Sequence, residues 1–126
     1  MSENVIIIAE AGVNHNGDLS CAMQLVDAAA DAKVDYVKFQ TFKADKIVSK
    51  SAKKAQYQKN NTGDNNDSQY EMLKRLELSE DDHVKLQEYS TKKGVKFFST
   101  AFDLDGLDYL NTLGFEMFKV PSGEIT

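Results

Sequence analysis

The sequence predicts a parallel α/β protein, and three observations support this fold class. Short apolar runs alternate along the chain with segments whose apolar residues recur at helical spacing. The first run is apolar throughout instead of alternating with polar residues, which is typical of a strand covered on both faces. Polar and charged side chains end the runs, and parallel α/β proteins carry their chemistry beyond the carboxyl ends of the strands.

The first part of the chain contains two expected strands with a helix between them. The apolar run covers residues 4–10 and ends at Glu10. Asp18 is suited to cap a helix over residues 19–32, where apolar residues share one face. β-Branched and aromatic residues then predict a second strand over residues 36–41.

A polar stretch at about residues 43–68 follows the second strand and is rich in Lys, Asn, Asp, Gln and Ser. A structureless segment of this length is uncommon inside a compact domain and is usually either a functional lid or disordered. We interpret it as an excursion on the substrate side of the sheet, with a solvated loop as the open alternative. Helical spacing returns at residues 69–76.

The second part of the chain repeats the strand and helix order. Ser79 caps a helix with an acidic first turn, Gly94 ends it, and a third strand is expected over residues 95–100. Leucines at helical spacing predict a helix over residues 104–113, and residues 116–120 are expected to form a fourth strand. Because no helix follows that strand, we expect the chain to be an incomplete domain.

Composition argues against several classes of function. The 126 residues fit one domain, and a hydrophobic content of 41% is enough for a core. The net charge of −5 argues against a nucleic-acid surface, which needs clustered Lys and Arg. A single cysteine, Cys21, offers neither a disulfide framework nor a thiolate metal site. Without a long apolar segment or a basic leader, we expect a cytoplasmic protein with no membrane partner.

Lysines and hydroxyl groups near the strand ends predict an anion site. Lys38 and Lys119 each interrupt an otherwise apolar strand, and Ser122 follows Lys119 in the run Lys-Val-Pro-Ser-Gly-Glu. An ammonium group with nearby hydroxyl donors suits a phosphate or a carboxylate. The competing interpretations are plain turn chemistry for the loop residues and lysine stems that only cover apolar surface.

The two histidines receive different interpretations. His15 lies in a loop beside two asparagines, where it either joins a site or holds the turn by hydrogen bonds. His83 lies in the acidic first turn of a helix, and we expect it at the surface.

Four ordered segments carry a wider pattern: residues 8–17 (IAEAGVNHNG), 37–42 (VKFQTF), 98–103 (FSTAFD) and 118–125 (FKVPSGEI). Together with SQYEML at residues 68–73, they resemble the bacterial sialic acid synthases, the N-acetylneuraminate and legionaminate synthases, over all 126 residues. One departure is Ala101, where the family more often has proline. It leaves Ser99 and Thr100 in place.

The resemblance implies a (β/α)8 TIM barrel of which residues 1–126 are the N-terminal half. It implies condensation of phosphoenolpyruvate with N-acetylmannosamine or a related N-acyl hexosamine, which gives a nonulosonic acid and releases phosphate. It also implies a divalent metal, manganese or magnesium, whose ligands lie in later strands and not in this chain. We expect the chain alone to be inactive and to form a homo-oligomer through its exposed strand edges.

The resemblance further implies roles for the matching positions. Glu10 and Glu124 would be the catalytic carboxylates, the first contacting the amino sugar or metal-bound groups and the second transferring a proton. Lys38 and Lys119 would neutralise the phosphate and carboxylate of phosphoenolpyruvate. The other substrate-binding positions would be hydrogen-bond donors or sugar contacts: Thr100, Ser122, Gln40 and Asn14.

A protein of a different class is still open at this point, namely a flavodoxin-like module that binds an anion without catalysis. No glycine-rich nucleotide loop opens the first helix, which disfavours nucleotides as ligands. A natural reading frame that continues into further strand-helix units would favour the enzyme.

Overall fold

The computed structural model describes residues 4–47 and 65–125, so most of the polar excursion lies outside the described residues. The elements are β1 (Ile8–Gly12), α1 (Leu19–Asp31), β2 (Tyr36–Thr41), α3 (Asn65–Leu76), α4 (Glu80–Lys93), β3 (Lys96–Ala101), α5 (Leu104–Thr112) and a 3-10 turn (Ser122–Glu124). Residues 44–47 are also helical. Within these ranges, every helix is too short or too polar to cross a membrane.

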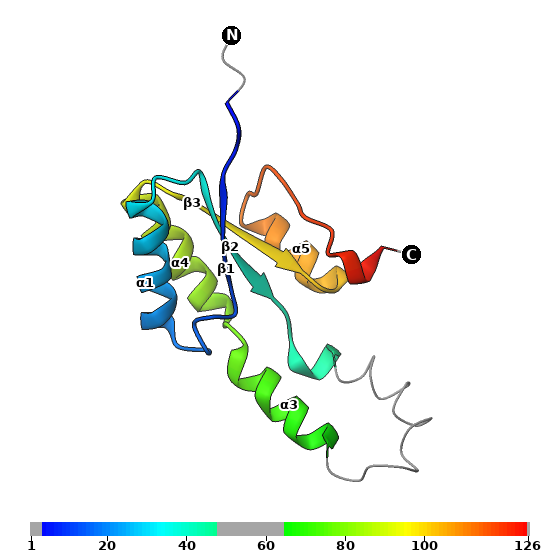
Figure 1. Cartoon of the computed structure of the whole chain (residues 1–126). Helices are drawn as coiled ribbons and strands as arrows, with labels where there is room; N and C mark the ends of the chain where they lie inside the picture. Colours follow the sequence, from blue (N-terminus) through cyan, green and yellow to red (C-terminus); the bar gives the residue numbers. More distant parts are fainter. Residues whose placement is uncertain (1–3, 48–64, 126) are drawn as a thin grey trace.

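The three strands form one parallel sheet in the order β1-β2-β3 (Figure 1). Tyr36 of β2 lies opposite Ile8 of β1 and opposite Lys96 of β3, so the strands begin at the same level. Their carboxyl ends lie on the side of the sheet where α3 and the C-terminal turn are found (Figure 1). The predicted parallel arrangement is confirmed for these strands.

Helices α1 and α4 lie side by side and cover one face of the sheet (Figure 1). The core between them and the sheet consists of Ala11, Ala22, Val26, Ala29, Val37, Phe39, Leu78, Leu86, Val95 and Phe97. Burying each large apolar side chain of this set contributes roughly 1.5–3 kcal/mol. This layer therefore fixes the position of the strands.

Side chains at the helix ends explain why the helices start and stop where the sequence predicts. The Asp18 carboxylate accepts the backbone N–H of Ser20 at 2.7 Å, which satisfies a donor at the start of α1. Ser79 and Asp82 form a reciprocal capping box at the start of α4. Gly94 ends α4 with a φ of 83°, a left-handed conformation that glycine adopts without strain.

Alternation along β2 separates two environments. Val37 and Phe39 are buried in the helix-covered core. Lys38 and Gln40 therefore point to the opposite face of the sheet, because successive side chains of a strand alternate. This opposite face carries the side chains that the sequence singles out.

A β-bulge interrupts the pairing of β1 with β2. Glu10 lies opposite Lys38, but the next residue of β2, Phe39, lies opposite Gly12, so Ala11 is the extra residue. Gly12 has a φ of 56°, and a Cβ atom there would lie 3.2 Å from Oε1 of Glu10. The bulge and the glycine therefore leave room for the Glu10 carboxylate beside Lys38.

The first strand begins later than predicted. Regular pairing covers Ile8–Gly12, while the side chains of Val5, Ile6 and Ile7 are between 54% and 82% exposed. The apolar run does not mark a strand buried on both faces, because no element among the described residues covers residues 5–7.

The predicted fourth strand is not formed. Residues 116–120 have no strand pairing, and Phe118 and Val120 are exposed. Just before them, Phe115 approaches the aromatic rings of Phe97 and Phe98 with ring centroids 5.7 and 6.3 Å apart. The segment therefore approaches β3 through side-chain contacts, whereas a strand would need backbone hydrogen bonds to a neighbour and cover for its faces.

Candidate functional site

Lys38 is the centre of a polar contact between all three strands. Its Nζ atom lies 2.5 Å from Oε2 of Glu10 on β1 and donates to Oγ1 of Thr100 on β3 at 3.4 Å. The register brings the three residues together, since Glu10 lies opposite Lys38 and Thr100 opposite Gln40. The sequence places Glu10 and Lys38 at the ends of their strands, but Glu10 is the middle residue of β1 and Lys38 the third residue of β2, so only Thr100 lies near a carboxyl end.

The burial of Lys38 is unusual for a lysine. Its side chain is only 8% exposed, whereas that of Glu10 is 53% exposed. A buried ammonium group is costly unless it is paired and hydrogen-bonded, and Glu10 and Thr100 supply both interactions. The arrangement fixes a positive charge next to a carboxylate that solvent and small molecules can reach.

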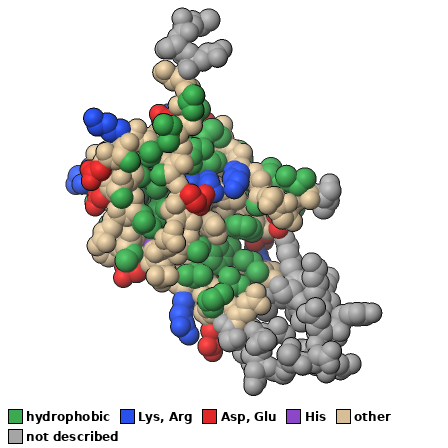
Figure 2. Space-filling view, in the orientation of Figure 1, with side chains coloured by type: hydrophobic (Ala, Val, Ile, Leu, Met, Phe, Trp, Pro, Cys, Tyr) green, Lys and Arg blue, Asp and Glu red, His purple; other side chains and the backbone are tan. Residues whose placement is uncertain are grey.

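Gln40 and Glu124 line an open pocket of about 630 Å³ beyond the strand ends. Its apolar wall comes from Val13, Phe42, Ile47, Leu73, Leu76 and Phe102. Figure 2 shows hydrophobic side chains gathered on this face of the molecule, with acidic and basic side chains next to each other near its centre. The pocket thus combines a few polar groups with apolar surface, as small-molecule sites generally do.

Lys119 lines a neighbouring pocket of about 610 Å³. Phe102, Asp103 and Glu124 contribute to both pockets, so the C-terminal segment lies against the end of β3. Ser122 is exposed in the 3-10 turn that also carries Glu124.

The structure divides the site residues predicted from the sequence into those that touch one another and those that only line the same pocket. Glu10, Lys38 and Thr100 are in contact, and Gln40 and Glu124 share a pocket. Asn14 is exposed in the loop after β1, next to the pocket residue Val13.

His15 is fully buried and holds the loop between β1 and α1. Its Nδ1 atom accepts the backbone N–H of Gly17 at 2.8 Å, which makes Nε2 the protonated nitrogen. Among the described residues, Nε2 has no hydrogen-bond partner. Burial lowers the pKa of His15, and the nearby His83 adds to this effect. Of the two interpretations of His15, the geometry matches a residue that holds the turn.

The prediction that His83 lies at the surface is wrong, since its side chain is 2% exposed. Its spacing already indicates burial, because His83, Leu86 and Ser90 recur at helical spacing and are the buried residues of α4. The acidic residues of the first turn concealed this signal.

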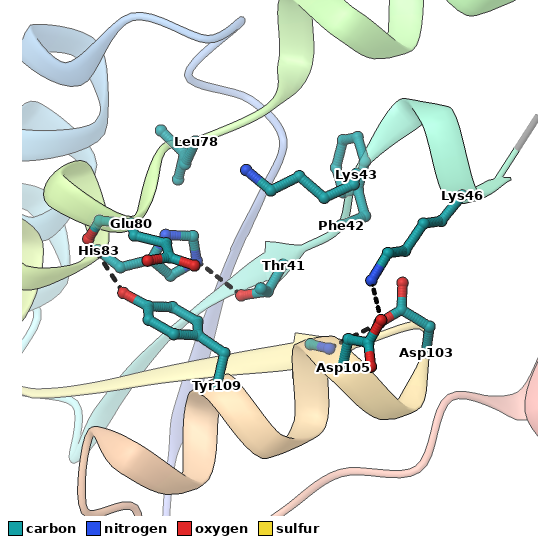
Figure 3. A pocket seen from close by; sticks show the side chains of 11 residues that line it. Thr41, Phe42, Lys43, Lys46, Leu78, Glu80, His83, Asp103, Asp105 and Tyr109 are labelled. Atoms are coloured by element: carbon teal, nitrogen blue, oxygen red, sulfur yellow. Dashed lines mark hydrogen bonds and ion pairs between the residues drawn. The ribbon is translucent and has the colours of Figure 1, made fainter.

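His83 belongs to a buried polar cluster with Thr41 of β2 and Ser99 of β3, which sequence reasoning did not identify. Thr41 Oγ1 lies 2.7 Å from Nε2 of His83 and 2.6 Å from Oγ of Ser99. Figure 3 shows the Thr41–His83 hydrogen bond at the wall of a small cavity of about 90 Å³, between β2 and the first turns of α4 and α5. Burial lowers the pKa of His83 and thus favours the neutral ring.

In residues 4–47 and 65–125, no three His, Cys, Asp or Glu side chains gather in a way that could hold a metal ion.

A parallel sheet with helices on one face and the Lys38–Glu10 ion pair on the other defines the class, which is that of the parallel α/β proteins. The chain belongs to the NeuB family, whose profile matches residues 25–126.

Two curated relatives are N,N'-diacetyllegionaminic acid synthases. The one from Legionella pneumophila subsp. pneumophila is 56% identical over 125 residues, which are 99% of this chain and 35% of the relative. The one from Campylobacter jejuni is 51% identical over 124 residues, 98% of this chain and 37% of the relative. The chain therefore spans about a third of the length of these relatives.

A similar solved structure is the N-acetylneuraminic acid synthetase from Leptospira borgpetersenii serovar Hardjo-bovis in complex with citrate. It superposes with a TM-score of 0.73 at 35% identity and covers 94% of this chain and 36% of that protein. The comparisons confirm the resemblance and the fold class, the N-terminal part of a (β/α)8 barrel. They favour the barrel fold over a flavodoxin-like module.

Proposed function

We propose that this chain is the N-terminal part of a nonulosonic acid synthase, which condenses phosphoenolpyruvate with an N-acyl hexosamine and releases phosphate. The observation that carries the proposal is the buried Lys38, held between Glu10 and Thr100 on the face of the sheet opposite α1 and α4 in a NeuB family chain. Phosphoenolpyruvate is a polyanion, and an ammonium group already fixed in place stabilises its charge without reorganisation during the reaction.

The anionic substrate would lie between β2 and the C-terminal segment. Lys38 and Thr100 would bind one of its two anionic groups, and Lys119 and Ser122 the other. This division is supported by the position of Glu124, which lines the pocket of Lys119 and also the pocket of Gln40. Residues 1–126 would form one unit of the closed barrel, with the excursion at residues 43–68 on the substrate side.

The amino sugar would occupy the pocket of about 630 Å³. Glu10, Gln40 and Asn14 would contact its polar groups, and Leu73 and Leu76 would provide apolar surface for an N-acyl methyl group. Glu124 would transfer a proton near the aldehyde carbon or the attacking water. The relatives named as diacetyllegionaminic acid synthases support an amino sugar with more than one N-acyl group.

The divalent metal of the family does not fit the described residues by themselves, because they offer no cluster of three suitable ligands. We propose that its ligands, for manganese or magnesium, lie in the two thirds of the relatives that this chain does not span. We derive no step through the metal from this chain. We likewise propose that the whole protein is a homo-oligomer.

The test measures binding and turnover separately. In a ¹⁵N-labelled sample of the chain, added phosphoenolpyruvate should shift the resonances around Lys38, Gln40 and Thr100. Lys38→Met should abolish these shifts, and Lys85→Met, which removes an exposed lysine of α4, should preserve them. The chain alone should release no phosphate from phosphoenolpyruvate and N-acetylmannosamine.

Turnover requires the rest of the barrel, so it is measured in a chimaera in which this chain replaces the matching part of the Legionella synthase. Lys38→Met should lower kcat/KM there by about 100-fold or more. Unchanged phosphoenolpyruvate binding in Lys38→Met, or metal-dependent turnover by the 126-residue chain alone, would contradict the proposal.

A further inference from the structure

We propose that His83 is a positioning residue for the anion site, acting through Thr41 and Ser99 on the far side of the sheet. The identity of the substrate in this inference rests on the proposed function, whereas the hydrogen bonds of His83, Thr41 and Ser99 do not depend on it. Neither Thr41 nor Ser99 can touch a ligand held at Lys38, because both side chains belong to the helix-covered face.

The tautomer of His83 follows from its surroundings. Nδ1 lies 2.7 Å from the backbone carbonyl oxygen of Ser79, which can only accept, so Nδ1 carries the proton. In the neutral ring, Nε2 is then an acceptor, and the hydroxyl of Thr41 must donate to it at 2.7 Å. The Thr41 oxygen in turn accepts from the hydroxyl of Ser99 at 2.6 Å. The cluster therefore has a single consistent direction of donation.

The ring of His83 cannot easily turn out of this arrangement. It meets Phe97 of β3 and Tyr109 of α5 edge-on, at interplanar angles of 86° and 87°. The Tyr109 hydroxyl donates to the carbonyl oxygen of Glu80 at 3.0 Å, which ties α5 to the first turn of α4. The acceptor nitrogen of His83 is thus held at a fixed place on the sheet.

The two hydroxyl residues of the cluster are sequence neighbours of site residues on both β2 and β3. Thr41 follows Gln40 on β2, and Ser99 precedes Thr100 on β3. Gln40 and Thr100 lie opposite each other in the register, so the Thr41–Ser99 hydrogen bond spans the same point of the sheet from its other face. A change in the spacing of the strands on the helix side would therefore shift the donors on the anion side.

The first experiment tests the tautomers directly. The chain has two histidines, so long-range ¹H–¹⁵N spectra of the imidazole rings contain two sets of signals. His83 should carry its proton on Nδ1 and His15 on Nε2, and the assignment follows from a His15→Gln variant. A His83 ring protonated on Nε2, or on both nitrogens at neutral pH, would overturn the proposal.

The second experiment separates positioning from core packing with two variants. His83→Phe keeps an aromatic ring against Phe97 and Tyr109 but removes the acceptor. His83→Gln keeps an acceptor for Thr41 but loses the ring. We expect His83→Phe to be the more stable variant and yet the weaker binder, with about a fivefold to tenfold loss of affinity for inorganic phosphate. His83→Gln should stay within about twofold of the wild type.

Tyr89→Phe is the matched control, because it removes a hydrogen bond of α4, to Asp27 at 2.6 Å, that lies outside the cluster, and its phosphate affinity should be unchanged. If the affinity of the two His83 variants follows their stability, His83 is a packing residue and the proposal is wrong. Phosphate affinity tests the role of His83, and turnover of the chimaera tests the proposed function, so the two can fail independently. Loss of condensation in the wild-type chimaera would contradict the proposed function, while the phosphate ranking would still decide the role of His83.

Discussion

At the scale of single residues, the two histidines couple the stability of the fold to pH. Burial is the largest cause that lowers the pKa of each, so both remain neutral in the folded chain at pH values where an exposed histidine takes up a proton. In the unfolded chain their pKa returns to ~6.5. The unfolded state therefore binds more protons as the pH falls below that value.

We predict that the free energy of unfolding is fully retained well above pH ~6.5 and falls as the pH is lowered through that value toward 5. Asp27, Asp45 and Asp105 also have a lowered pKa, from hydrogen bonds with Tyr89, Tyr70 and Lys46 respectively, but these groups lose their contribution at more acidic pH. Urea unfolding at several pH values measures the effect, and His83→Phe should flatten the curve. A urea midpoint that increases as the pH is lowered from 7.5 to 5 would contradict the prediction.

The sequence predicts single residues well where the strand pattern and the side-chain chemistry agree. Lys38 and Glu10 stand out because a charge in or at the end of an apolar strand needs a partner, and they partner each other. Thr41 gave no such signal, since a hydroxyl in a strand is ordinary, and Ser99 stood out only as a polar group near the end of its strand. Their role depends on His83, which is 42 residues from Thr41 and meets it only in the folded chain.

At the scale of elements, the loop after β1 is packed tightly against the end of α3. A Cβ atom on Gly17 would lie 1.7 Å from the backbone carbonyl oxygen of Arg75. Gly94 at the end of α4 has a similar φ, 83° against 78°, but a Cβ atom there would meet nothing within 4 Å. The two glycines therefore separate the cost of a left-handed backbone from the cost of a collision.

We predict that Gly94→Ala destabilises the chain by about 1 kcal/mol, from backbone strain alone. Gly17→Ala should cost roughly 1–3 kcal/mol more, because the loop or the last turn of α3 must move. Chemical denaturation gives both values, and the resonances of α3 should change only in the Gly17 variant. Equal costs for the two substitutions would show that α3 is not held against this loop.

Element boundaries were predictable wherever local chemistry decides them. The bounds of β2 and the caps of α4 match the expectation because aromatic residues, a capping serine and a terminal glycine act locally. The expected fourth strand failed for a non-local reason. Its apolar residues are suitable, but a strand also requires a hydrogen-bonding neighbour and cover, which no described element provides.

At the scale of the whole molecule, the sheet has two unpaired edges in its described part, one on β1 and one on β3. Exposed apolar side chains lie near both ends of the chain, including Ile6 and Val120. Unpaired edges and apolar surface of this kind promote association. Because the expected fourth strand is not formed, β3 and not that strand is the second unpaired edge.

We predict that the 126-residue chain self-associates at micromolar concentration, burying roughly 1,000 Å² or more in a stable pair. Analytical ultracentrifugation should show a dimer or a larger species. Ile6→Lys should weaken this association, and Val84→Lys on the outer surface of α4 should not. A compact folded monomer in the wild type would contradict the prediction.

The alternation along β2 has an evolutionary consequence. Lys38 and Gln40 face the pocket side, while Val37 and Phe39 face the helices, so neighbouring codons are subject to different selection. In the proposed synthase, substitutions at Gln40 would change which ligand is accepted and leave the fold intact, whereas substitutions at Val37 and Phe39 would lower the amount of folded protein. New specificities of the proposed synthase would therefore arise at Gln40 without renewed selection of the scaffold.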